Sequence, residues 1–182
     1  AFEVTDFADY RAKLAAANVM LDPAERRQTI AQQAASLAKA ANLSVKDDPG
    51  LLDEVTGLVE WPQVLIGRIG ETFMDLPAEV LTTSMRAHQK YLALLEGRGR
   101  LSNRFMLVAN METKDKGKTI VAGNERVLRA RLADARFFWD QDRKQTLASR
   151  ASRLGDIVFH EKLGTLDAKV DRMQALATEI GD

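Results

Sequence analysis

The densest group of polar side chains in the sequence surrounds residue 88, where a helix is expected to give way to a strand. Arg86 and His88 are side chains of the kind that orient a phosphate or take part in acid–base chemistry, and Gln89 can bind a base edge or a backbone oxygen. Ser84 precedes His88 by one helical turn, but no acid is evident that would orient the imidazole for nucleophilic catalysis. The structural alternative is that Arg86 and Gln89 are solvated and that His88 caps the helix C-terminus.

Motifs for other chemistry are missing from the sequence. There is no cysteine, and His88 has no second histidine or cluster of acids near it, so it is a poor metal ligand. His160 begins the stretch HEKLG, which lacks the second histidine of a zinc-protease helix. Nucleophile elbows, dinucleotide turns and phosphate loops are also absent. We therefore expect neither a catalytic residue nor a metal site.

A long amphipathic helix is predicted from Gly123 to Lys144. Gly123-Asn124 is expected to start it, because Asn accepts hydrogen bonds from the free N–H groups of a first turn. At about 100° per residue, one side is apolar and the adjoining side is basic. The apolar side holds Leu128, Leu132, Ala135, Phe138 and Trp139, and the basic side holds Arg126, Arg129, Arg136, Arg143 and Lys144.

Arg131 breaks this separation, because it projects from among the apolar positions. One interpretation is an ion pair with Asp134 and a packed aliphatic stem, and the other is a helix that faces a negatively charged partner. Periodicity alone favours the first. Phe137, Phe138 and Trp139 lie near arginines and can stack on bases, but the last two fit the apolar side.

The charge of the chain is balanced overall but unevenly distributed. A formal net charge of zero argues against a general nucleic-acid binder. Residues 1–62 carry ten acidic and six basic residues, whereas residues 86–104 carry five basic and one acidic, and residues 123–154 eight basic and four acidic. The two basic segments can converge on one patch, although charge runs are commonly solvated faces.

The order of the expected elements indicates an α+β fold. Helices over residues 6–43, the second starting at Asp22-Pro23, precede a linker at 43–50 and a short helix at 51–60. A strand at 63–70, a helix at 78–89 and a hairpin of strands at 90–95 and 104–111 follow, then a polar loop at 112–123 and helices to the end. We predict a helical segment 1–48, a mostly antiparallel core 49–122 and a helical extension 123–182.

The composition fits one domain, or one domain with a helical extension. Of the 182 residues, 46% are hydrophobic, which is enough for a core. No apolar run approaches the roughly 20 residues that span a membrane. The absence of cysteine suits a cytosolic protein. Because residue 1 is not Met, we expect a piece of a longer chain.

Five stretches resemble the β subunit of the bacterial heterotetrameric glycyl-tRNA synthetase, in matching order and spacing. The stretch GNERVLRARLADARFFW is the most specific, although Arg129-Ala130-Arg131 stands where the family is expected to have a proline between the arginines. The matching stretches are 51–62, 76–91, 104–110, 123–139 and 158–169.

The resemblance implies a supporting role in aminoacylation. Its partners would be the α subunit, which holds the ATP- and Mg-dependent glycine-activating site, and tRNA(Gly), in the cytoplasm, with no membrane and no DNA involved. The fold would be similar to the B3/B4 module of phenylalanyl-tRNA synthetase, leading into a helical HD-type domain. The chain itself would hold no cofactor. Candidates for facing tRNA or a partner are Arg86, His88, Gln89, Asn124, Arg126, Arg129, Arg131 and Arg136.

Three functions are compatible with this resemblance. The first is a surface for tRNA or for neighbouring domains, motivated by the two basic segments. The second is a pure assembly scaffold. The third, favoured least, is an editing-type hydrolase that would remove mischarged amino acids in a pocket near Ser84 and His88.

Overall fold

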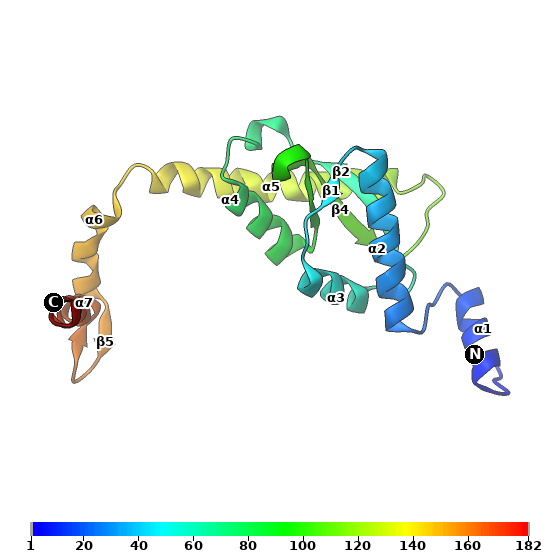
Figure 1. Cartoon of the computed structure of the whole chain (residues 1–182), viewed down its shortest axis with the longest axis horizontal. Helices are drawn as coiled ribbons and strands as arrows, with labels where there is room; N and C mark the ends of the chain where they lie inside the picture. The colour runs from blue at the N-terminus through cyan, green and yellow to red at the C-terminus, as the bar shows by residue number, and fades with distance from the viewer. Residues whose placement is uncertain (1, 182) are drawn as a thin grey trace. The chain divides into compact units, whose positions relative to one another are not determined.

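The computed structural model describes residues 2–181 (Figure 1). The chain forms two compact units, Ala1–Arg136 and Phe137–Asp182. The mixed α+β class is confirmed, whereas the domain boundaries proposed after residues 48 and 122 remain predictions.

An antiparallel sheet is the centre of the first unit. Within the described residues it has four strands in the order β1-β3-β4-β2, with β1 at Ser44–Val45, β2 at Gln63–Arg68, β3 at Leu92–Leu95 and β4 at Leu101–Ala109. β3 and β4 form the predicted hairpin, joined by the short 3-10 turn η3 (Gly97–Gly99). The expected linker at 43–50 is wrong in one respect, because β1 pairs with β3. A strand of two residues is too short to show an alternating pattern, so the sequence of β1 alone does not reveal that it pairs with β3.

Helices α2 (Pro23–Ala40) and α3 (Pro49–Leu58) pack with one face of this sheet. Asp22 caps α2 as predicted, since its Oδ1 accepts from the Ala24 N–H at 2.8 Å. Helix α1 (Phe7–Ala16) precedes α2, and Arg11 forms an ion pair with Glu25 at 2.6 Å. The main core cluster consists of Ile30, Ala34, Ala38, Leu51, Val55, Val59, Val64, Leu92, Leu94 and Met106.

Elements on the opposite face place the candidate residues. Successive strand residues alternate between faces, so Leu65 and Gly67 of β2 point away from the α2–α3 side, to which Val64 and Ile66 belong. Helix α4 (Ala78–Ser84) and the long helix α5 (Lys118–Asp142) lie on the side of Leu65 and Gly67. The 3-10 turn η1 (Glu71–Phe73) precedes α4, and the π-helical turn η2 (Met85–Gln89) continues it. The segment entering α5 packs on the sheet here, because an added Cβ at Gly117 would lie 2.6 Å from the Leu65 methyl groups.

The start of α5 differs from the prediction. The helix begins at Lys118, so residues 118–123 are helical and Gly123-Asn124 lies inside the helix. Asp115 provides the cap, because its Oδ2 accepts from the Thr119 N–H at 2.9 Å while its Oδ1 accepts from the Gly117 N–H at 3.1 Å. Gly117, with φ of 80°, turns the chain into the helix.

The second unit contains a hairpin that was not predicted. After α6 (Leu147–Arg150) and the 3-10 helix η4 (Ala151–Asp156), strands β5 (Val158–His160) and β6 (Gly164–Thr165) pair antiparallel and lead into α7 (Leu166–Gly181). The Lys169 ammonium lies 4.1 Å from the centre of the Phe159 ring and links the hairpin to α7. The strands are only three and two residues long, too short for an alternating pattern to reveal them.

Candidate functional site

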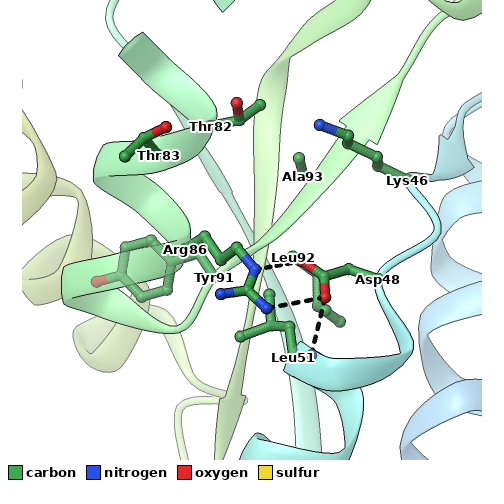
Figure 2. Close-up of a pocket in the computed structure, with 9 residues that line it drawn as sticks. All are labelled: Lys46, Asp48, Leu51, Thr82, Thr83, Arg86, Tyr91, Leu92 and Ala93. Carbon is green, nitrogen blue, oxygen red and sulfur yellow. Dashed lines mark hydrogen bonds and ion pairs between the residues drawn. The ribbon is translucent and has the colours of Figure 1, made fainter. Parts of the chain in front are cut away.

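A hollow of about 230 Å³ lies between α4 and the segment that joins β1 to α3, with β3 forming part of its wall (Figure 2). Lys46 and Asp48 come from the β1–α3 connection, and Thr82, Thr83 and Arg86 come from α4 and its π-helical end. The Lys46 N–H donates to the Ala93 carbonyl at 2.9 Å, so the β1–α3 connection is attached to the β3 wall of the hollow. The remaining lining residues are Leu51, Tyr91, Leu92 and Ala93.

Arg86 is held by a two-point interaction with Asp48. Its Nε and one Nη donate to the two carboxylate oxygens at 2.6 and 3.2 Å. The same carboxylate caps α3, because Oδ1 accepts from the Leu51 N–H at 2.9 Å. The hydrogen bonds from Arg86 are the main reason that the pKa of Asp48 is lowered, and Asp48 in turn raises the pKa of Arg86. Arg86 therefore ties the end of the α4–η2 helix to the start of α3.

Lys46 supplies the cationic group of the hollow that is open to a ligand. Its side chain is exposed, and no hydrogen bond or ion pair joins it to another described residue. Tyr91, by contrast, is engaged: its hydroxyl donates to Asn124 Oδ1 at 2.6 Å, and burial raises the pKa of the phenol. Among the described residues that line the hollow, no base is arranged to activate a nucleophile.

Neither Ser84 nor His88 lines this hollow. The helix widens into the π-helical turn at Met85, so residues four apart no longer stack on one line. His88 is exposed, and no hydrogen bond joins it to Ser84 among the described residues. In the alternative interpretation His88 caps the helix, but the side-chain hydrogen bond to this end of the helix comes from Lys90, which lies at φ of 58° and donates from Nζ to the Ala87 carbonyl at 3.2 Å. Gln89 is half-buried beside it.

Two of the candidates on α5 are used inside the first unit. Asn124 accepts from Tyr91 and donates from Nδ2 to the Ile120 carbonyl at 2.8 Å, so it lies within the helix and does not start it. Arg136 donates to both carboxylate oxygens of Asp75 and to the Thr72 carbonyl, and the pKa of Asp75 is lowered as a result. These contacts fix α5 against the segments that follow β2 and α4.

The other three candidates on α5 extend into solvent. Arg126, Arg129 and Arg131 are all exposed, and no hydrogen bond or ion pair joins them to any residue from 2 to 181. Arg126 and Arg129 are three residues apart and therefore neighbours on the helix surface, whereas Arg131 lies about 160° around the helix from Arg129. The expected ion pair between Arg131 and Asp134 is not present among the described residues. The Arg131 guanidinium is exposed to solvent, so it needs no buried partner.

The apolar side of α5 is shorter than predicted. Leu128 and Leu132 are buried and Ala135 and Trp139 are half-buried, but Phe138 is 63% exposed. Phe137 and Phe138 contact each other edge to face with ring centres 5.5 Å apart. Phe138 is therefore not a core residue among the residues that the structure describes.

Neither a metal-binding cluster nor a membrane-spanning helix is found among residues 2–181. No group of three or more His, Cys, Asp or Glu side chains there is placed to hold a metal ion. No helix in this range has the length and apolar character to cross a membrane.

The family described as "Glycyl-tRNA synthetase beta subunit" matches the chain over residues 1–182. The chain belongs to this family. The glycine–tRNA ligase beta subunit of Rhodospirillum centenum is 60% identical over 177 residues, which is 97% of this chain and 25% of that protein. Those of a Ruegeria species and a Janthinobacterium species are 51% and 52% identical over 98% and 86% of this chain, and 27% and 23% of their own length. The chain thus spans about a quarter of the length of these relatives.

Sequence reasoning missed the residues that face Arg86. Asp48 is 38 residues away along the chain, in a stretch that was expected to be only a linker. The one local signal was the sequence Asp48-Pro49, the same cap-and-proline pattern that predicted the start of α2 at Asp22-Pro23. Nothing in the local pattern indicated that Lys46 would lie opposite Thr82.

Proposed function

We propose that this chain is part of a glycine–tRNA ligase β subunit and that it supports glycyl-tRNA synthesis by offering a binding surface on α5. In this proposal, tRNA(Gly) and the α subunit are the partners, and the enzyme acts in the cytoplasm. ATP and Mg are used on the α subunit to activate glycine, while the chain described here contributes no cofactor site. The relatives, which are glycine–tRNA ligase beta subunits, support the ligase assignment.

The observation that carries the tRNA role is the pair of free guanidinium groups at Arg126 and Arg129. Arginines that stabilise a fold have internal partners, as Arg86 and Arg136 do. Arg126 and Arg129 have none among the described residues and are adjacent on an exposed helix surface. Guanidinium groups bind phosphates in two-point geometry, and phosphate contacts supply most of the sequence-independent affinity for nucleic acid. This pair is therefore suited to a phosphate backbone.

The test is binding of tRNA(Gly) by the complete enzyme, measured over a series of salt concentrations. The variant carries Arg126→Glu and Arg129→Glu together, and the control carries Arg172→Glu, an exposed arginine within helix α7. Loss of two phosphate contacts is expected to flatten the slope of log K against log salt by roughly 1.5–2. The control is expected to keep the slope of the unmodified enzyme.

Unchanged affinity and slope in the double variant, with normal folding and assembly, would rule out the RNA role of this surface. Loss of α subunit binding with unchanged tRNA affinity per assembled enzyme would favour the scaffold function. One observation supports the scaffold: none of the residues 137–181 is buried, as expected for a segment that packs on further protein. The hydrolase alternative has no such support, because no hydrogen bond joins Ser84 to His88 among the described residues and neither lines the hollow.

A further inference from the structure

The last helix, α7, carries a continuous line of apolar side chains. Leu166, Val170, Met173, Ala177 and Ile180 are spaced by four, three, four and three residues, so they lie within about 80° of one another around the helix. We call these residues the α7 seam. Most side chains outside the seam are polar or charged, among them Asp167, Asp171, Arg172 and Glu179, although the exposed Leu176 lies beside the seam, and α7 is therefore amphipathic.

Only the first turn of this seam is covered within the second unit. The Leu166 N–H donates to the Ile157 carbonyl at 2.9 Å, and Leu166 is half-buried beneath the hairpin and η4. Beyond that turn the seam is open: Val170 is 43% exposed, Met173 58% and Ile180 76%.

The rest of the second unit provides nothing that can close over it. Between residues 137 and 181 no residue is buried, and eleven large apolar side chains are exposed, among them Leu147, Val158 and Leu163. An amphipathic helix gains most of its stability from burying its apolar face. The second unit therefore lacks a core and needs further protein to complete it.

We propose that the α7 seam is covered by a helix from the part of the same polypeptide that lies outside these 182 residues. Apolar spacing that alternates between four and three residues is the pattern of side chains that interlock with a second helix at a small crossing angle. The relatives are about four times as long as this chain, so the polypeptide has ample further sequence. A helix on the same polypeptide is present at an effective concentration in the millimolar range, which a separate partner rarely reaches.

Site-specific photocrosslinking in the full-length β subunit tests this assignment. A benzoylphenylalanine replaces Met173 on the seam and, in the control protein, Ala175, which lies about 200° around the helix from Met173. Crosslinked peptides are identified by mass spectrometry, with a mixture of isotopically light and heavy chains to separate contacts within a chain from contacts between chains. The expected product joins α7 to a helical segment of the same chain outside residues 1–182, at least tenfold more abundant from position 173 than from 175.

A product that joins position 173 to the α subunit, to a second copy or to residues 1–136 would overturn the proposal. Equal yields from both positions would overturn it as well. A second measurement does not depend on crosslinking chemistry: in the full-length chain, Met173→Asp is expected to accelerate amide exchange throughout α7 at least tenfold, whereas Ala175→Asp leaves it unchanged. Equal exchange in the two variants would show that the seam is uncovered.

Discussion

Replacement of Gly67 by alanine tests how closely the sheet is packed where α5 crosses it. Gly67 lies opposite Phe105 in the pairing of β2 with β4. A methyl group at Gly67 would lie 2.7 and 2.9 Å from the Cζ and Cε1 atoms of Phe105, which is inside van der Waals contact. Phe105 has no exposed surface and stacks on Tyr91 with ring centres 4.5 Å apart, so its ring has little room to move.

The expected cost follows from two opposing effects. Overpacking a well-filled core costs about 1–3 kcal/mol, while replacing glycine lowers the entropy of the unfolded chain and returns about 0.4–1 kcal/mol, which leaves a net loss centred on about 1.3 kcal/mol, on the order of 1–2 kcal/mol. With a urea m-value of roughly 2 kcal/mol/M, the unfolding midpoint would fall by roughly 0.5–1 M.

Gly123→Ala is the matched control, because the same methyl group is added inside α5 where no atom lies within 4 Å of it. Alanine in a helix interior is more stable than glycine by about 0.8–1 kcal/mol, so this midpoint should rise. Unfolding of the first unit can be followed by the fluorescence of Trp61 in a Trp139→Phe background, since the sequence has two tryptophans.

Coupling to Phe105 makes the test specific. Phe105→Leu replaces the ring that blocks the new methyl group with a shorter side chain. Its loss of unfolding free energy should therefore be at least about 1 kcal/mol smaller in the Gly67→Ala background than in the unmodified chain. A Gly67→Ala midpoint equal to or above that of the unmodified chain would refute the packing argument. A fall with Gly123→Ala would instead refute the position of Gly123 inside α5.

Two further predictions concern the ends and contacts of α5. Asn124→Ala leaves the buried Tyr91 hydroxyl without its acceptor, so the free energy of urea unfolding should fall by about 1–3 kcal/mol. Tyr91→Phe in that background should recover part of the loss. If the losses of the two single variants simply added in the double variant, the contact would be contradicted. Hydrogen bonds from the Thr113 and Thr119 side chains hold the pKa of Asp115 well below its usual range. Its contribution to stability is therefore complete above the unfolded pKa of about 4 and is lost as the pH falls toward the lower folded value. The Thr119 amide shift, followed by NMR, should titrate below pH 4 and lose this titration in Asp115→Ala.

Local patterns predicted the elements whose signals lie within a few residues. Asp22-Pro23 marked the start of α2, the β3–β4 hairpin followed from two apolar runs around a glycine turn, and Leu128 and Leu132 were placed on the buried side of α5. The failures have two causes. Strands of two or three residues have too short a pattern, and the cap of α5 at Asp115 lay in a stretch that was assigned to a polar loop.

The candidate residues show more clearly which features the sequence revealed and which ones depended on tertiary packing. Their types and helical spacing were visible in the sequence, and the specific stretch around Arg129 was enough to indicate the family. Which arginines hold the fold together and which are free was decided by residues distant in sequence. Arg86 meets Asp48 because β1 pairs with β3, and Arg136 meets Asp75 because α5 packs across the sheet. Periodicity records only the direction of a side chain from its own helix, whereas the partner of a charge depends on what tertiary packing places beside it.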